Sequence, residues 1–243
     1  MIDMRDIHFL AAAVCGLASA QPALAEPWTV SGEASLVSDY NSRGLSLSGR
    51  KPAVQAGLSL SNANGMHADV WSSTISRTAK GARAEVDISL GYTASLEGDG
   101  ALDVGVTYYH YPSDSELDFI EMTAEVTQKF GTASVTGAIA YAPKQDLMRA
   151  PDGRLRDNVY VSLDAEQPIA GTPFSLVAHA GYERGYFDGC LRGGKLDWSV
   201  GALVNWKGVA LGAYYVDSEA SSFEPGVRDF AGSTGLLSAS ISF

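Results

Sequence analysis

Residues able to carry acid–base or nucleophilic chemistry are few and scattered in this sequence. Beyond residue 25 the histidines are His67, His110 and His179, and they fall in three separate segments without a nucleophile motif around them. Hydrolytic catalysis needs a nucleophile, a histidine and an acid held together. Such a site would require His110 to lie beside Ser113 or Asp114 and a further acid. We therefore predict packed or interfacial histidines and no catalytic residue.

Metal and cofactor chemistry is not indicated either. No two His or Cys residues stand at the spacing of zinc ligands, and the acidic loop segments lack the regular Asp/Asn pattern of a calcium site. Cys190 has no disulfide partner if Cys15 is removed with a leader, so we expect a free thiol in a surface loop. With 17 basic and 28 acidic side chains, the net charge of -11 argues against a nucleic-acid partner.

Carboxylates that alternate with apolar residues are the one constellation that indicates a function. Between Ala84 and Leu96 apolar residues alternate with polar ones, and Glu85 and Asp87 fall on the polar face. A period of two residues indicates a β-strand with one apolar and one wet face. If the apolar faces contact lipid, the carboxylates that project inward are Glu33, Asp69, Glu85, Asp87, Asp103, Glu121, Glu125, Asp164, Glu166, Glu183 and Asp197.

The elements that would position these carboxylates are strands throughout. We expect about twelve, near residues 28–41, 52–61, 66–76, 83–96, 101–112, 117–130, 132–142, 158–168, 173–186, 195–206, 208–217 and 233–243. Most exceed the five or so residues of typical soluble strands and suit tilted strands that cross a bilayer. The predicted fold class is all-β, a transmembrane antiparallel up-and-down β-barrel over residues 26–243. A secreted soluble β-sandwich is the alternative, because its strands alternate too.

The breaks between the predicted strands alternate in length. Long breaks such as 42–51 and 143–157 are separated by short ones such as 62–65. Outer-membrane barrels have this asymmetry, with short periplasmic turns and longer extracellular loops. Trp198 and Trp206 share one face, eight positions apart, which is near the spacing of the two aromatic girdles of such barrels.

The first 25 residues are typical of a cleaved signal peptide. An apolar run over residues 9–17 precedes a small-x-small cleavage site at residues 23–25. Lipidation of Cys15 is less favourable, because Val14 is a poor residue before a lipidated cysteine. We expect export, cleavage near Ala25 and residence in the bacterial outer membrane.

Motifs between residues 38 and 76 resemble one known family. In chain order they are Ser38-Asp39-Tyr40, Arg43-Gly44-Leu45-Ser46, Lys51-Pro52-Ala53-Val54-Gln55 and Val70-Trp71-Ser72-Ser73. The set resembles the TorF-type porins, also called the Gcw-chp family, and the likeness extends over most of residues 28–243. The resemblance implies an outer-membrane barrel with the passive transport of a porin. It implies no catalytic residue, and the long breaks at 143–157 and 217–232 follow no pattern of the family.

Three functions follow from a barrel with acidic inward faces. The first is a narrow passive pore for small hydrophilic solutes, weakly selective for cations because a carboxylate-lined channel concentrates counter-ions. Small inward residues such as Gly91 and Gly105 favour open space for it. The second is a closed structural barrel in which loop arginines pair with the carboxylates and the loops bind a partner. The third, the least favoured, is a barrel enzyme acting at the outer rim.

Basic residues gather in the first two long breaks: Arg43, Arg50, Lys51, Arg77 and Lys80. They would contact the phosphates of lipopolysaccharide, fold inward as a constriction opposite the acids, or stay solvated without a role. The expected partners are outer-membrane lipid, lipopolysaccharide and the barrel assembly machinery. That machinery would read the C-terminal strand, since outer-membrane barrels commonly end on an aromatic residue such as Phe243. The sequence indicates no oligomeric state.

Overall fold

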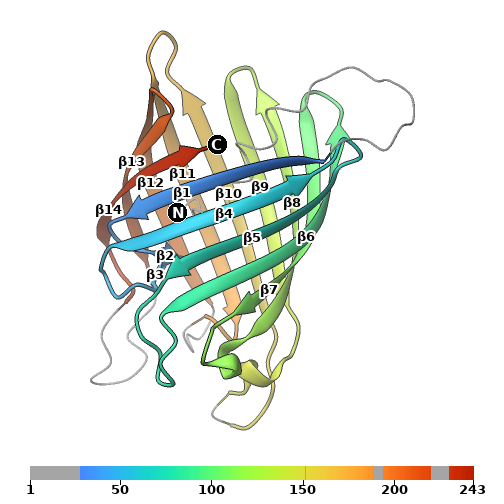
Figure 1. The fold of residues 1–243 in the computed structure, drawn as a ribbon, viewed down its shortest axis with the longest axis vertical. Helices are drawn as coiled ribbons and strands as arrows, with labels where there is room; N and C mark the ends of the chain where they lie inside the picture. Colours follow the sequence, from blue (N-terminus) through green and yellow to red (C-terminus); the bar gives the residue numbers. More distant parts are fainter. Residues whose placement is uncertain (1–27, 151, 189–193, 220–229) are drawn as a thin grey trace.

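Twelve antiparallel strands form one closed barrel (Figure 1). The computed structural model describes residues 28–150, 152–188, 194–219 and 230–243. Neighbouring strands follow chain order, and β1 closes the wall by pairing with both β4 and β14. The wall strands are β1 Thr29–Val37, β4 Ala53–Ser61, β5 Met66–Thr74, β6 Ala84–Leu96, β7 Gly100–His110, β8 Phe119–Phe130, β9 Ala133–Ala142, β10 Asn158–Pro168, β11 Phe174–Gly185, β12 Lys195–Trp206, β13 Val209–Ser218 and β14 Thr234–Ser242.

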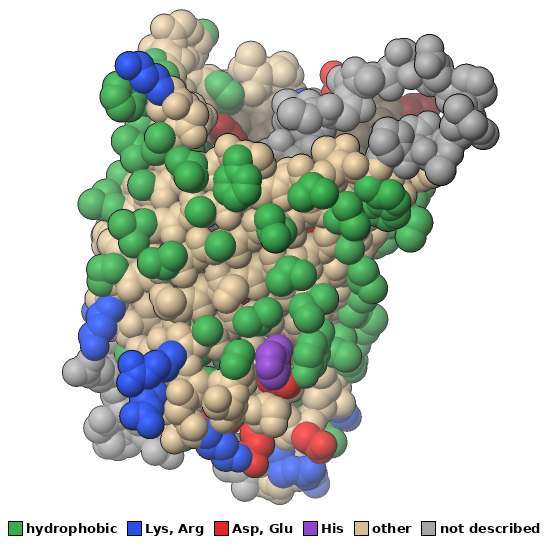
Figure 2. Space-filling model, in the orientation of Figure 1, with side chains coloured by type: hydrophobic (Ala, Val, Ile, Leu, Met, Phe, Trp, Pro, Cys, Tyr) green, Lys and Arg blue, Asp and Glu red, His purple; other side chains and the backbone are tan. Residues whose placement is uncertain are grey.

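The wall carries apolar side chains outside and polar side chains inside. On β6, Ile88 and Leu90 are exposed to the surroundings, whereas Glu85 and Asp87 are buried. Figure 2 shows hydrophobic side chains spread over the outer wall, with most of the Lys and Arg side chains of this view at the lower end. This arrangement inverts a soluble core and matches a lipid-facing barrel. The soluble β-sandwich alternative is therefore wrong, since one sheet closes on itself and leaves its apolar face uncovered.

The predicted strands agree with the wall in number, and their ends agree to within two residues except at one place. The first strand was expected over residues 28–41, but β1 ends at Val37 and residues 38–41 leave the wall. The alternation breaks at this point, since Leu36 and Val37 are both apolar and Ser38 and Asp39 are both polar. The chain leaves the wall after Ser38, which is bonded to Leu237 on β14. The Ser38 amide donates to Leu237 O at 2.9 Å, and Ser38 Oγ accepts from the Leu237 amide at 2.9 Å.

The two ends of the barrel are built differently. At one end the connections are short: β12 and β13 are joined by Lys207 and Gly208, both left-handed with φ of 52° and 83°. Such a pair forms the two-residue turn whose twist matches adjoining strands. At the other end the connections are long and include two single 3-10 turns, Ser115–Leu117 (η1) and Asp146–Met148 (η2). No helix formed by the described residues is long and apolar enough to cross a membrane.

The seam between the first and last strands is closed by Phe243. Its amide donates to Gly32 O at 2.9 Å, and the Gly32 amide donates to Phe243 O at 2.7 Å. A Cβ on Gly32 would lie 2.5 Å from Cε2 of the Phe243 ring. Gly32 is therefore the residue that lets the terminal ring lie flat on the seam.

Replacing Gly32 with valine is expected to destabilise the barrel by about 1–3 kcal/mol, because the added methyl groups overpack against the ring. The measurement is the temperature or urea concentration at which the folded band is lost in heat-modifiability gels. Gly137 on β9 is the matched control, since a Cβ there meets nothing within 4 Å. Equal stability of Gly32→Val and Gly137→Val would show that the ring contact does not support the seam.

Candidate functional site

The first long connection folds into the barrel. This segment, residues 38–51, contains β2 (Asn41–Ser42) and β3 (Leu45–Ser46), which pair with each other, and we call it the inner hairpin. Its side chains contact Glu85 on β6, Glu121 on β8 and Glu183 on β11. Its backbone contacts Ser218 at the end of β13. Contacts to strands so widely separated around the wall show that the hairpin extends across the interior.

The inner hairpin is held in shape by its own hydroxyl groups. The carboxylate of Asp39 accepts hydrogen bonds from Ser46 Oγ at 2.6 Å and Ser48 Oγ at 2.7 Å. Ser48 Oγ also accepts a hydrogen bond from the Tyr40 amide at 2.8 Å. These side chains are buried, and burial without water favours polar groups that satisfy one another. The result is a compact loop that presents its tip, Arg43, to the far wall.

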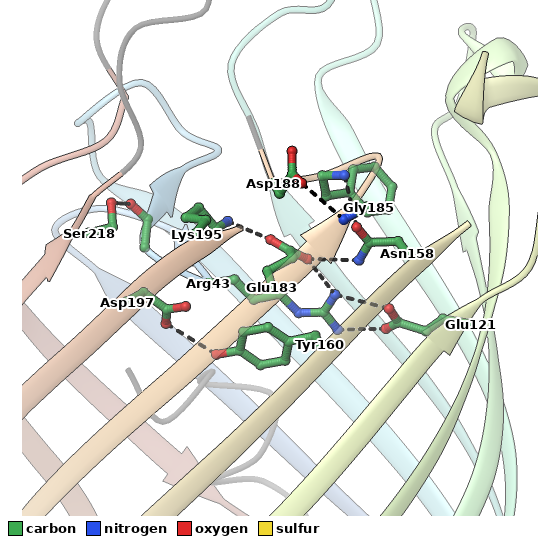
Figure 3. Close-up of polar contacts among 12 residues, drawn as sticks. Arg43, Glu121, Asn158, Tyr160, Glu183, Gly185, Asp188, Lys195, Asp197 and Ser218 are labelled. Carbon is green, nitrogen blue, oxygen red and sulfur yellow. Dashed lines mark hydrogen bonds and ion pairs between the residues drawn. The ribbon is translucent and has the colours of Figure 1, made fainter. Parts of the chain in front are cut away.

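Arg43 binds two buried carboxylates at once (Figure 3). Its guanidinium donates to both oxygens of Glu121, at 2.9 and 2.7 Å, and to Glu183 at 3.2 Å. The guanidinium carbon lies 4.4 Å from the centre of the Tyr160 ring, a cation–π contact. Burial would lower the pKa of Arg43, but the charges of Glu121 and Glu183 outweigh it and hold this pKa above its ordinary value.

The carboxylates that receive Arg43 have further partners on the wall. Glu121 accepts from the Tyr109 hydroxyl at 3.1 Å. Glu183 lies 2.5 Å from Lys195 Nζ and accepts from Asn158 Nδ2 at 3.0 Å. Both glutamates are 1% exposed. Buried charges are tolerated when paired and hydrogen-bonded in this way, so the wall holds a complete receptor for the hairpin tip.

Gly44 allows the hairpin tip to approach the wall. Its backbone is left-handed, with φ of 76°, and its carbonyl accepts from Ser218 Oγ at 2.8 Å. A Cβ at this position would lie 2.4 Å from the Cβ of Ser218 and 2.8 Å from the Cβ of Asp197. Any other residue would therefore push the tip away from β12 and β13.

The base of the inner hairpin packs against Trp71 of β5, and Gln55 of β4 links the neighbouring strands. The Tyr40 ring meets Trp71 edge to face at 5.4 Å, and its hydroxyl donates to Glu85 at 3.0 Å. Gln55 accepts from Ser35 Oγ at 3.3 Å and donates to Ser73 Oγ at 3.2 Å. The motifs that carry the family resemblance are thus the hairpin and the residues beneath it.

A cavity of about 530 Å³ lies between the hairpin tip and the end with the short turns. It begins near Ser61 and Phe243 and reaches Arg43, Glu121 and Tyr160. The predicted inward carboxylates that line it are Glu33, Asp69, Asp87, Asp103, Glu121 and Glu125. Glu85, Asp164, Glu166, Glu183 and Asp197 lie on the same inward faces of their strands but do not line this cavity.

Two histidines join the inward carboxylates, which the sequence reasoning missed. His67 lies between Asp69, at 2.8 Å, and Asp103, at 3.0 Å. His179 lies between Asp164, at 2.7 Å, and Asp197, at 3.1 Å, and its Nε2 is 2.9 Å from the Tyr160 hydroxyl. A signal existed, because His67 and Asp69 are two positions apart and share a strand face.

His110 has a different partner from the one a rim enzyme would need. Its Nδ1 lies 2.8 Å from Asp118, and its ring stacks on Tyr108. Burial by itself would raise the pKa of Asp118. Hydrogen bonds from the Tyr108 hydroxyl, the Tyr111 amide and His110 outweigh this effect and hold the pKa below its ordinary value. Neither Ser113 nor Asp114 is placed against His110 by these contacts. In the part of the chain that the structure describes, no group of His, Cys, Asp or Glu is arranged to hold a metal ion.

The five loop bases do not stay together. Arg43 enters the barrel, whereas Arg50 donates to Ala231 O at 2.6 Å and Lys80 pairs with Glu116. Lys51 and Arg77 are exposed. Cys190, much of the 217–232 loop and the predicted signal peptide lie outside the described residues.

Comparisons with known proteins place this geometry among bacterial barrels. A family model described as "Bacterial protein of unknown function (Gcw_chp)" matches residues 20–243. The solved NanC porin superposes with a TM-score of 0.58 at 11% identity, over 88% of this chain and 99% of the porin. The KdgM porin, solved in complex with disordered oligogalacturonate, gives 0.57 at 7% identity, over 88% and 98%. These likenesses concern the fold. A search of curated proteins finds no match.

Proposed function

We propose that this chain, which belongs to the Gcw_chp family of bacterial proteins of unknown function, is a porin-like channel for small hydrophilic solutes. The observation that carries this proposal is a closed wall, apolar outside, around a cavity of about 530 Å³ whose lining includes six carboxylates. A barrel that only anchored loops would have no need of a hollow, charged interior. The similarity in fold to the NanC and KdgM porins supports the same function.

Cation preference is the finer part of the proposal. Six carboxylates line the cavity, and the basic side chains of its lining are already paired: Arg43 with Glu121 and Glu183, and His67 with Asp69 and Asp103. Low-dielectric walls strengthen the field of such groups and concentrate cations. The acidic lining here therefore favours cationic solutes, whereas the oligogalacturonate of the KdgM complex is an anion.

The inner hairpin supports a narrow or gated channel over a wide one. It extends across the interior at the end with the long loops and is anchored there by buried ion pairs. The alternative function, a closed barrel whose loops bind a partner, is favoured by the same observation. The two differ in whether any ion current passes.

Location and partners follow from the channel proposal. The apolar wall suits the outer membrane, with the short turns toward the periplasm and the long loops outward. Exposed Lys51 and Arg77 at the long-loop end suit the phosphates of lipopolysaccharide. Phe243 and its seam strand suit recognition by the barrel assembly machinery, and a leader cleaved near Ala25 would deliver the chain to it.

The experiment is conductance of the refolded, detergent-purified protein in planar bilayers under a KCl gradient. Discrete current steps whose reversal potential indicates cation preference are expected. A correctly folded, heat-modifiable barrel that passes no current, even with the hairpin tip released by mutation, would overturn the channel and leave the structural barrel.

A further inference from the structure

The wall side chains that hold Arg43 surround its guanidinium group with two carboxylates and an aromatic face. We propose that this pocket, made of Glu121, Glu183 and the face of Tyr160, is a solute-binding subsite for small guanidinium-bearing cations. Arg43 occupies it in the closed state and a solute occupies it when the hairpin tip withdraws. The inference rests on the channel function proposed above, since it names the class of solute that the channel takes. We call this set of three residues the guanidinium pocket.

The geometry of the guanidinium pocket matches a planar cation with forked donors. Two parallel bonds of 2.9 and 2.7 Å join the guanidinium to one carboxylate, and a third of 3.2 Å reaches the second. The aromatic ring covers one face of the plane at 4.4 Å. An ammonium group presents a compact charge and cannot make the paired bonds or stack on the ring in the same way.

The guanidinium pocket belongs to the wall and not to the hairpin. Glu121 lies on β8, Tyr160 on β10 and Glu183 on β11, so the rigid barrel sets their positions. Each is held by a wall neighbour: Tyr109 donates to Glu121 at 3.1 Å, Asn158 donates to Glu183 at 3.0 Å, and the Tyr160 hydroxyl donates to Asp197 at 3.1 Å. Withdrawal of the hairpin would therefore leave the receptor formed and empty, which lowers the cost of binding a replacement.

When Arg43 leaves the guanidinium pocket, the negative charge of the pocket favours a replacement cation. Lys195 neutralises Glu183 at 2.5 Å whether or not the hairpin is present. The charged partner that the structure gives Glu121 comes from the hairpin. Loss of Arg43 leaves a carboxylate that is 1% exposed without its cation, and a buried charge of this kind strongly favours a new partner. Glu121 is thus the principal ligand for a solute.

A solute has room to reach the guanidinium pocket. The cavity of about 530 Å³ includes Arg43, Glu121 and Tyr160 in its lining, and this volume is within the range of small-molecule sites. Along the way Glu33, Asp87 and Glu125 line the cavity with negative charge. A cationic solute entering from the short-turn end would therefore be drawn toward the occupied pocket.

Arg43 competes with the solute as a tethered ligand. A group held on a short loop acts at an effective concentration in the millimolar range or above. Wild-type protein should therefore bind free guanidinium compounds weakly, and removal of Arg43 should reveal the underlying affinity. This relation provides a test that needs no ion current.

The experiment is calorimetric titration of the full-length, detergent-purified barrel with methylguanidinium, and separately with methylammonium as the probe of charge alone. Arg43→Ala is expected to bind methylguanidinium about tenfold or more tightly than wild type, as release from a millimolar internal competitor predicts. It should prefer methylguanidinium to methylammonium, and adding Glu121→Gln should remove the gain. Arg154→Ala, which removes an exposed arginine from the connection between β9 and β10, should behave as wild type.

Two results would overturn the guanidinium pocket. One is equal, weak binding of both probes by folded Arg43→Ala protein, and the other is a gain that survives Glu121→Gln. If Arg43→Ala fails to fold, Arg43→Gln and the displacement variant Gly44→Val provide the same comparison. Because binding is measured directly, a failed titration with intact conductance rejects the pocket alone, and successful titration without conductance rejects the channel alone.

Discussion

Replacing Arg43 with alanine is expected to raise single-channel conductance several-fold over wild type. Arg43 is the tip of the inner hairpin, and three of its bonds reach the far wall at 2.7–3.2 Å. Charge-assisted, bidentate bonds are the strong ones in proteins, so their loss removes the main attachment between the tip and β8 and β11. The hairpin base, held by Tyr40 and Asp39, remains in place. The measurement is unitary conductance in planar bilayers at fixed KCl concentration.

Two variants separate the position of the tip from its charge. Gly44→Val keeps Arg43 but places side-chain atoms where Ser218 and Asp197 already stand, so conductance should rise with it as well. Arg154→Ala removes an exposed arginine from the connection between β9 and β10 and should leave the conductance unchanged. If Arg43→Ala and Gly44→Val both conduct as wild type does, the inner hairpin is not the constriction.

Neutralising the carboxylates of the cavity is expected to reduce cation selectivity sharply. In an Arg43→Ala background, the triple change Glu33→Gln, Asp87→Asn and Glu125→Gln removes three negative charges from the cavity lining. The reversal potential under a KCl gradient should move most of the way to zero, because these groups create the field that concentrates cations. The shift should shrink at high salt, where the screening length is only a few ångströms.

The control for selectivity is an acid outside the barrel. Asp146, at η2 on the long-loop end, has a fully exposed side chain, so Asp146→Asn should leave the reversal potential where it was. Arg43→Ala alone should be more cation-selective than wild type, since it removes the cation paired with Glu121 at the hairpin end of the cavity. A reversal potential of anionic sign in the parent variant would contradict an acidic selectivity filter.

Most of the fold could be predicted from the alternation of apolar and polar residues. The part that could not be predicted depends on contacts between residues far apart in the chain. Alternation decides which face of a strand meets lipid, so the strands and the inward position of Glu85, Asp87 and Glu121 followed from it. The inner hairpin did not, because its serines and glycines are equally typical of a solvated surface loop. Its burial depends on Arg43 meeting residues 78 and 140 positions away, which no local pattern encodes.

The functional site shows the same division. The acidic character of the interior could be read from residue types, and the inward folding of loop bases was one of the alternatives left open. Which base would enter could not be read, since Arg43, Arg50 and Lys51 have similar charge and lie close together in the chain. The left-handed backbone at Gly44 and its contact with Ser218 decide in favour of Arg43. Arg43 and Gly44 stand together in one of the family motifs, but the motif alone does not give the physical reason for their pairing.

The attachment points of the inner hairpin also constrain the order in which the molecule is assembled. The hairpin follows the first strand, yet its partners stand on β6, β8, β11 and β13. These partners are brought together only when nearly all of the sheet has been paired, so docking of the tip must be a late event. Until then Glu121 and Glu183 lack their ion pairs with Arg43 and remain solvated. Assembly of the wall and burial of Glu121 and Glu183 are therefore coupled steps, and the tip reaches all of its partners only after β13 has been added.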